Sequence, residues 1–247
     1  MKLSDNTVFI TGGASGIGFA LAKGFLELKN TVVICGRNSD KLKWVKERFP
    51  DIHVIPCDVT NEGDLKKAFE FIKNEFGGLD ILVNNAGIQY RFDFCTEKDV
   101  IRKIDEEIDI NFRAVVRLTN IFMPLLEKAP QAAIVNVSSG LGIVPKKSAP
   151  GYCATKAAIH AFSKSLRYQL EKTSIKVFEL FPPLTDTDMT RGREDDIHKE
   201  SPDFAANKFF SKFAKDHCEI KPGLMNIMLL QMNRFLPSLA EKIAKKR

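Results

Sequence analysis

The sequence has little cysteine, and the few cysteines follow no pairing pattern. Cys35, Cys57, Cys95, Cys153 and Cys218 are scattered and odd in number, and none of them forms a Cys-x-x-Cys pair. That pattern argues against a disulfide framework and fits a reducing compartment. The four histidines likewise show no metal-ligand spacing. We therefore expect no structural disulfide and no metal site.

Long apolar runs, low-complexity tracts and internal repeats are also missing. No signal peptide precedes the first apolar run at 7–10, and no uncharged stretch is long enough to cross a bilayer. These absences predict a cytoplasmic protein. The net charge is +6, but basic and acidic residues alternate along the polar segments, as in 40–48. A mixed charge pattern gives no reason to expect a nucleic-acid partner.

What the sequence does have is an ordinary globular composition over 247 residues, with 44% hydrophobic and 28% charged residues. This length suits one large α/β domain. Short β-branched runs alternate with amphipathic, helix-like stretches. The predicted strands include 8–10, 32–34, 53–55, 81–83, 134–137 and 176–180, with a last one at 219–221. The predicted helices are 17–28, 39–49, 62–76, 97–127 with a break in its middle, and 151–172.

This alternation predicts a single-domain α/β Rossmann fold, in which a doubly wound parallel sheet of about seven strands carries helices on both faces. The first four strands are nearly all apolar, as expected for a sheet that is covered on both sides. Ligands of such sheets bind beyond the carboxyl ends of the strands. Candidate functional residues are therefore expected just after each predicted strand.

A glycine-rich loop follows the first strand and opens the first helix, with the spacing G-x-x-x-G-x-G. Glycines let backbone N–H groups approach a pyrophosphate, and the helix N-terminus adds free donors and a favourable dipole. Many glycine clusters are plain turns, but this one has the strand and the helix that dinucleotide binding requires. The loop residues expected to contact the cofactor are Gly12, Ser15, Gly16, Ile17 and Gly18.

The second strand ends at Cys35-Gly36-Arg37-Asn38, about 20 residues after the loop. In dinucleotide-binding folds an acidic residue at this turn binds the ribose hydroxyls of NAD, whereas an arginine accommodates the 2′-phosphate of NADP. The turn has no acid, and the Arg37 guanidinium pairs well with phosphate. We therefore predict NADP(H) as the preferred cofactor, although an exposed loop arginine would look the same.

Tyr152 and Lys156 are four residues apart in a predicted helix, and Ser139 precedes Tyr152 by thirteen residues. Positions i and i+4 lie on one helix face, so the phenol and the ammonium point into the same space. A free tyrosine has a pKa of about 10, and a neighbouring cation favours its phenolate. This pairing would make tyrosine a usable acid and base. Alone, the pair is also typical of a solvated helix surface.

Taken together, the motifs resemble those of the short-chain dehydrogenase/reductase family over roughly residues 5–190. They are Thr11-Gly12-x-x-x-Gly16-x-Gly18, Asn84-Asn85-Ala86-Gly87, Asn111, Ser139 and Tyr152-x-x-x-Lys156. Within the family, residues 152–160 and Phe181-Pro182-Pro183 look most like the oxidoreductases encoded in bacterial D-alanyl-lipoteichoic-acid operons. The resemblance implies hydride transfer between a nicotinamide cofactor and a carbonyl or secondary alcohol.

The family assigns a role to each of four side chains. Tyr152 would be the general acid in reduction and the base in oxidation, and Lys156 would lower its pKa and bind the nicotinamide ribose. Ser139, rather than Ser138, would steady the carbonyl oxygen. Asn111 would hold a water molecule in a proton relay to Lys156. Each residue could also be structural, since a serine can end a strand and an asparagine can occupy a helix.

Further positions match cofactor contacts of the family. These are Asp58 and Val59 after the third strand, Asn85, Ala86 and Gly87 after the fourth, and Thr187. Where the family usually has Pro-Gly, this sequence has Pro182-Pro183. Because proline fixes φ and lacks the N–H, the loop over the nicotinamide is expected to be stiffer.

Substrate contacts are expected from 88–90, from Leu141, Ile143 and Val144, and from the segment after Thr187. Residues 188–203 read as a substrate lid or as a plain surface loop. The remainder, 204–247, departs from the family's common ending and reads as a helix, a strand and a helix. Its apolar, methionine-rich part could pack on its own domain, form the interface of a homodimer or homotetramer, or, less favourably, lie on a membrane surface.

Two functions remain open at this point. One is an NADP(H)-dependent oxidoreductase acting on a small-molecule carbonyl or alcohol, with the cofactor supplying the hydride chemistry. The other is a non-catalytic NADP-binding sensor or scaffold, because one fold serves many functions. A pure binder has no need of Tyr152, Lys156 and Ser139 together.

Overall fold

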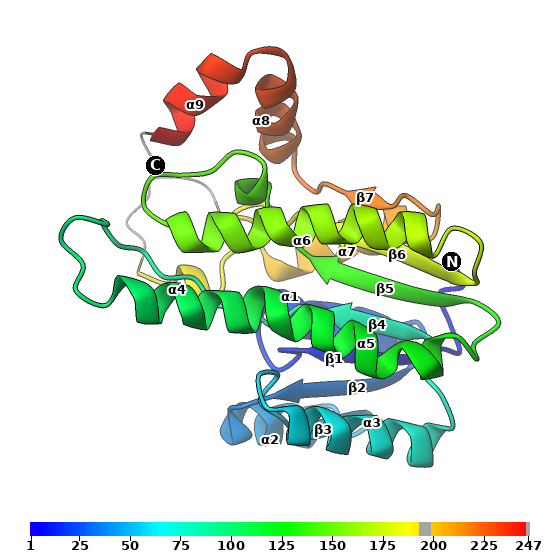
Figure 1. The fold of residues 1–247 in the computed structure, drawn as a ribbon. Helices are drawn as coiled ribbons and strands as arrows, with labels where there is room; N and C mark the ends of the chain where they lie inside the picture. The colour runs from blue at the N-terminus through cyan, green and yellow to red at the C-terminus, as the bar shows by residue number, and fades with distance from the viewer. Residues whose placement is uncertain (193–198, 246–247) are drawn as a thin grey trace.

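A computed structural model describes residues 1–192 and 199–245, with the backbone alone at 225–226 and 243–245. Seven strands form one sheet in the order β3-β2-β1-β4-β5-β6-β7, and every neighbouring pair is parallel (Figure 1). The strands are β1 Thr7–Thr11, β2 Thr31–Gly36, β3 Ile52–Pro56, β4 Ile81–Asn84, β5 Ala132–Val137, β6 Ile175–Leu180 and β7 Glu219–Ile220. The predicted doubly wound parallel sheet is confirmed.

Helices cover both faces of the sheet, and each face has its own apolar core. Along β1, Val8 and Ile10 face α1, α2 and α7, whereas Phe9 faces α3, α5 and α6. All three side chains are completely buried. The helices are α1 Gly16–Glu27, α2 Ser39–Arg48, α3 Glu62–Phe76, α4 Val100–Ile108, α5 Ala114–Leu126, α6 Pro150–Gln169, α7 Pro202–Phe213, α8 Leu224–Phe235 and α9 Pro237–Lys245. Successive side chains of a strand point to opposite faces of the sheet. Because both faces are covered by helices, both sets of side chains are apolar, and each strand appears in the sequence as a continuous apolar run.

The strand order reverses beside β1, which pairs with β2 on one side and β4 on the other. After β1 the chain enters α1 on one face, and after β4 it leads to α4 and α5 on the other face. At such a switch point the connections diverge and leave a crevice beyond the carboxyl ends of the strands. Those ends point to the left in Figure 1, so the predicted cofactor site lies on that side.

The predicted break in 97–127 does not occur. Instead, α4 continues through a π-helical turn, Asp109–Arg113, directly into α5. The backbone stays helical throughout, with φ/ψ of −64°/−46° at Asp109 and −60°/−41° at Arg113. A π turn holds one extra residue and occurs frequently at functional sites. The polar residues in the middle of this stretch therefore mark a widened turn and not a helix end.

The C-terminal part begins with α7 and β7, which complete one layer and the sheet edge, as predicted for the helix and the last strand. The segment then forms α8 and α9, which project from the top of the molecule in Figure 1. Several of their apolar side chains are exposed, including Leu224 at 84% and Phe235 at 70%. A small apolar cluster around Val144, Leu230 and Ala240 packs them against the body. Among the described residues, no helix is long and apolar enough to cross a membrane.

Candidate active site

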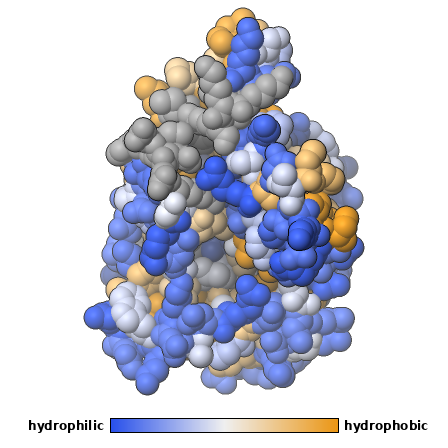
Figure 2. Space-filling view, turned by 90° about the vertical axis from the view of Figure 1, so that its left-hand side faces the viewer, coloured by the Kyte–Doolittle hydropathy of each residue, from blue (hydrophilic) through white to orange (hydrophobic). Residues whose placement is uncertain are grey.

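A cavity of about 960 Å³ opens beyond the carboxyl ends of β1, β4, β5 and β6. Figure 2 looks onto this side of the molecule, whose surface is hollowed near the centre between mostly hydrophilic residues. Most residues predicted from the sequence to form the site line the cavity. They are Gly12, Ser15, Gly16, Ile17, Arg37, Val59, Asn85, Ala86, Gly87, Ser139, Tyr152, Lys156 and Thr187. Gly18, Asp58 and Asn111 are not among the lining residues, but each lies next to one of them.

The glycine-rich loop is shaped by close backbone packing. Gly16 has φ +53°, which an L side chain rarely adopts, and Gly18 has no room for a Cβ against the Asn85 amide and the Gly12 carbonyl. Asn85 Nδ2 donates to the carbonyls of Thr11 (2.9 Å) and Gly12 (3.2 Å). The loop is thus held from below by the segment that follows β4.

The N-terminus of α1 is open toward the cavity. Ser15 occupies the N-cap position, and its side chain makes no capping hydrogen bond. The hydroxyl and the first backbone N–H groups of the helix can therefore serve an anion in the cavity. Thr187 approaches from the other side, since a Cβ on Gly16 would lie 3.0 Å from its Cγ2. This end of the site fits a diphosphate.

The far end of the cavity carries the guanidinium of Arg37, which makes no short ion pair within 1–192 and 199–245. Arg37 Nη1 lies 3.9 Å from Asp58 Oδ2, and the Arg37 side chain is 60% exposed. The Asp58 carboxylate mainly serves its own turn, because Oδ1 accepts from the N–H (2.9 Å) and the hydroxyl (2.8 Å) of Thr60. Asp58 therefore stands beside the cavity as a partner of Arg37, and Val59 provides the lining.

A second cation at this rim was not predicted from the sequence. Lys41 Nζ lies 2.5 Å from Asp188 Oδ2, and both residues line the cavity. The lysine pairing lowers the pKa of Asp188. The pair joins α2 to the segment after β6 and bridges the mouth of the cavity. The sequence around Lys41 or Asp188 contains no motif that would predict this ion pair, because the two residues are 147 positions apart.

Tyr152 and Lys156 lie on one face of α6, as their spacing predicted, and both are almost buried, at 8% and 5% exposure. Lys156 Nζ is 5.6 Å from the centre of the Tyr152 ring. It donates to the Val137 carbonyl at the end of β5 (2.7 Å). Burial lowers the pKa of Lys156 from its ordinary 10.5 to about 8, and the nearby Glu179 carboxylate opposes this shift.

The two serines after β5 have different positions. Ser139 lines the cavity, and its Oγ accepts from the Leu141 N–H (3.2 Å), which fixes the short turn Gly140–Gly142. Ser138 is only 2% exposed, and its hydroxyl donates to the Lys156 carbonyl (3.4 Å). Both serines line the cavity, and Ser139 is the more exposed of the two. The role of Ser139 at the substrate stays a prediction.

Asn111 lies in the π-helical turn and is 1% exposed. Its Oδ1 accepts from the Ile88 N–H (2.8 Å), and its Nδ2 donates to the Ile88 carbonyl (2.9 Å) and to Thr155 Oγ1 (3.1 Å). A Cβ on Gly87 would be 3.1 Å from Asn111 Oδ1 and 3.7 Å from Lys156 Nζ. Asn111 thus fixes the segment between the cofactor and substrate regions. The water relay through Asn111 stays a prediction.

Two buried carboxylates next to this machinery were missed. Glu107 on α4 is completely buried, and its Oε1 accepts from the Tyr90 N–H (2.7 Å). Glu179 on β6 is also completely buried, next to Lys156. Burial raises the pKa of both carboxyl groups. The signal for Glu179 was present, since it is a lone acid between Phe178 and Leu180 in an apolar strand.

The substrate side is partly as predicted. Ile88, Gln89, Tyr90 and Leu141 line the cavity, and α8 adds Leu224 and Leu229. Val144 is 1% exposed and packs with Leu230 and Ala240, so it supports α8 and α9 instead of the cavity wall.

The segment after Thr187 begins with a short turn, Asp188–Thr190, which adds Met189 to the lining. A bridge between Thr185 and Glu200 ties the two ends of this segment together. Arg193, Glu194, Asp195 and Asp196, which suggested a charged lid, lie outside the described residues. The choice between a lid and a surface loop stays a prediction.

Comparison with known proteins gives matches both in sequence and in structure. The sequence model described as short chain dehydrogenase matches residues 6–198. A Bacillus subtilis (strain 168) protein named "Uncharacterized oxidoreductase DltE" is 46% identical over 195 residues, which are 79% of this chain and 77% of that protein. The match to the family model ends before β7, α8 and α9.

Two solved structures share the fold along nearly the whole chain. A short-chain dehydrogenase from Burkholderia cenocepacia J2315 in complex with NADP has a TM-score of 0.87 at 22% identity, covering 99% of both chains. A short-chain dehydrogenase/reductase from Burkholderia phymatum in complex with NAD has the same TM-score, 0.87, at 18% identity, covering 97% of this chain and 96% of the other. At these identities the likeness concerns the fold alone.

Proposed function

Since the chain belongs to the short-chain dehydrogenase family, we propose that it is an NADP(H)-dependent oxidoreductase that interconverts a carbonyl and a secondary alcohol. One observation carries the proposal: Tyr152, Lys156 and Ser139 meet in the same cavity as the glycine-rich loop. A dinucleotide held at the loop would bring its nicotinamide end toward these three side chains. Binding and chemistry are thus parts of one site.

The residues at the loop end fit a dinucleotide phosphate. The open N-terminus of α1, the Ser15 hydroxyl and the backbone around Gly16 supply donors and positive potential for the diphosphate. Arg37 and Lys41 would hold the 2′-phosphate, and no acidic side chain stands at the end of β2 to favour a free ribose hydroxyl. When bound, the cofactor supplies or accepts the hydride.

Tyr152 handles the proton of the reaction. In reduction its hydroxyl donates a proton to the carbonyl oxygen as negative charge develops there, and in oxidation the phenolate takes the proton from the alcohol. The Lys156 ammonium favours the phenolate by its charge. Its anchoring to the Val137 carbonyl keeps it in place beside the Tyr152 ring. Lys156 would also bind the nicotinamide ribose, as in the family.

Ser139 and Asn111 would support this step from two sides. The Ser139 hydroxyl donates a hydrogen bond toward the carbonyl oxygen, which stabilises the developing charge. Asn111 fixes Ile88 and the neighbouring Gly87 beside Lys156. A water molecule held near Asn111 would return protons from solvent to Lys156. The apolar lining from Ile88 and Leu141 favours a substrate with an apolar body.

The test is turnover of NADPH with varied ketones, aldehydes and quinones, and of NADP with the matching alcohols. We expect Tyr152→Phe to abolish turnover and to leave NADPH binding, measured by nucleotide fluorescence, almost unchanged. Tyr168→Phe is the matched control, because Tyr168 lies on the same helix α6 but is 69% exposed. Equal turnover of Tyr152→Phe and the wild type would refute the mechanism. Cofactor binding without turnover of any substrate would favour a sensor or scaffold.

A further inference from the structure

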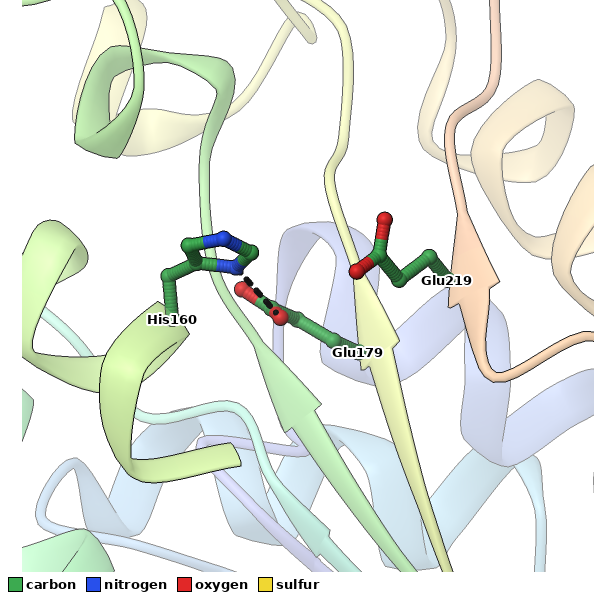
Figure 3. A group of neighbouring side chains, drawn as sticks. All are labelled: His160, Glu179 and Glu219. Atoms are coloured by element: carbon green, nitrogen blue, oxygen red, sulfur yellow. Dashed lines mark hydrogen bonds and ion pairs between the residues drawn. The ribbon is translucent and has the colours of Figure 1, made fainter. Parts of the chain in front are cut away.

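A second cluster of polar side chains lies behind Lys156, outside the lining of the cavity. His160 comes from α6, one turn after Lys156, Glu179 comes from β6, and Glu219 comes from β7 (Figure 3). One ring nitrogen and one oxygen of each carboxylate all lie within 4.8 Å of one another. The proposed oxidoreductase reaction uses none of the three.

The sheet itself brings the two carboxylates together. Glu179 and Glu219 are partners in the register between β6 and β7, so both project from the same face of the sheet. Like charges that stand opposite each other on neighbouring strands are destabilising. Lys221 compensates Glu219 from its exposed side (2.7 Å), and His160 Nδ1 lies 2.9 Å from Glu179 Oε2.

Glu179 has one carboxylate oxygen with unused bonding capacity, on the same carboxylate that meets the His160 ring. Its side chain is completely buried, and its Oε1 has no hydrogen-bond partner among the described residues. Ser138 lies close enough to lower the pKa of Glu179, but its hydroxyl donates to the Lys156 carbonyl. Leaving a buried carboxylate oxygen unpaired is costly. An electron-pair acceptor in the cluster would satisfy this atom.

We infer that His160, Glu179 and Glu219 form a binding site for one divalent transition-metal ion of the zinc type. Imidazole nitrogen and carboxylate oxygen are ligands of such ions, and two carboxylates balance the charge of the ion. Three protein ligands leave a position for water.

The geometry requires only a small adjustment. Zinc–ligand bonds of about 2.0–2.2 Å place ligand atoms roughly 3–4 Å apart, so the cluster must contract by about 1 Å. Glu219 can make this movement, because its side chain is 32% exposed and it sits on the edge strand β7. Its ion pair with Lys221 would loosen as the metal takes over the carboxylate.

The sequence argument against metal rested on the spacing of cysteine and histidine. These three ligands are spread over α6, β6 and β7, at intervals of 19 and 40 positions, and so leave no local motif. The inference does not depend on the proposed reaction, since it concerns residues that neither hold the cofactor nor exchange its protons.

The experiment is calorimetric titration of the full-length protein with Zn²⁺, after treatment with chelator. We expect one site per chain, and each of His160→Gln and Glu179→Gln should weaken binding at least about tenfold. His217→Gln and Cys218→Ser are controls for an exposed histidine and for the nearest thiol in the sequence. Both should bind Zn²⁺ as the wild type does.

Circular dichroism of each variant checks that it folds. If the substitutions of buried residues disturb folding, Glu219→Gln at the sheet edge is the deciding variant and should weaken Zn²⁺ binding. The inference is overturned if the wild type binds no Zn²⁺. It is equally overturned if folded ligand variants bind as tightly as the wild type, or if Cys218→Ser alone removes the site.

Discussion

Replacing Lys156 by methionine should make the protein more stable at neutral pH although it removes a residue of the proposed reaction. The side chain is 5% exposed, and burial lowers the pKa of its ammonium from 10.5 to about 8. Each pKa unit is worth about 1.4 kcal/mol, so a buried charge with this shift costs the native state about 3 kcal/mol. Methionine keeps the length and the apolar stem but carries no charge.

The pH dependence follows from the two protonation states. Below pH 8 the lysine is charged in both the native and the unfolded chain, and the full cost is present. Between pH 8 and 10.5 the native state has lost the proton that the unfolded chain still holds, so the cost falls as pH rises. From pH 7 to pH 9 the decrease amounts to about 1 kcal/mol. The lost hydrogen bond to Val137 offsets about 1–2 kcal/mol, independently of pH.

The assay is urea unfolding of the wild type and Lys156→Met at pH 7, 8 and 9. We expect the variant to be more stable by about 1–2 kcal/mol at pH 7, with an advantage that shrinks steadily toward pH 9. Titrating groups away from Lys156 are common to both proteins and cancel in the difference. A difference in the free energy of unfolding that does not change with pH would refute the reasoning, as would a variant that gains stability relative to the wild type as pH rises.

Two further substitutions test the cofactor end and the packing of the site. Arg37→Ala should lower kcat/KM with NADPH about 10- to 100-fold and leave that with NADH nearly unchanged, because only the former loses a charge-assisted phosphate contact. Equal losses with both cofactors in steady-state kinetics would argue against this role. Gly142→Ala should destabilise the protein by about 1–3 kcal/mol in urea unfolding, because its Cβ would lie 2.6 Å from the Lys156 carbonyl carbon. Gly78→Ala, whose Cβ would meet nothing within 4 Å, is the control, and equal effects of the two would contradict the packing argument.

Features determined by neighbouring residues could be predicted from the sequence. Apolar runs located every strand of the sheet within a few positions. Glycine spacing after β1 located the turn that opens α1, and the i, i+4 spacing placed Tyr152 and Lys156 on one face of α6. These features depend on backbone geometry and side-chain periodicity, which repeat over a few residues.

Features determined by distant residues could not be predicted. The contacts of Lys41 with Asp188 and of His160 with Glu179 and Glu219 exist only because the sheet order brings their elements together. The π turn could not be predicted from the sequence for another reason. Its residues, Asp109–Arg113, have helical dihedral angles and ordinary helix composition, so the sequence marks polarity there but not the extra residue. The packing of α8 and α9 could not be predicted either, because an amphipathic pattern does not specify the surface against which a helix packs.

The extra residue in the π turn Asp109–Arg113 changes which side chains lie on each face of the continuous helix formed by α4 and α5. In a regular α-helix each residue advances by about 100°, so one residue too many rotates everything beyond the π turn by roughly that angle relative to what precedes it. In this continuous helix, α4 packs against α6, and α5, with a different side, packs against α3. Removing a single residue from Asp109–Arg113 would swing these two sides out of step by about a quarter of a turn. The length of this segment therefore matters to the packing of α4 and α5, in addition to the contacts that Asn111 makes within it.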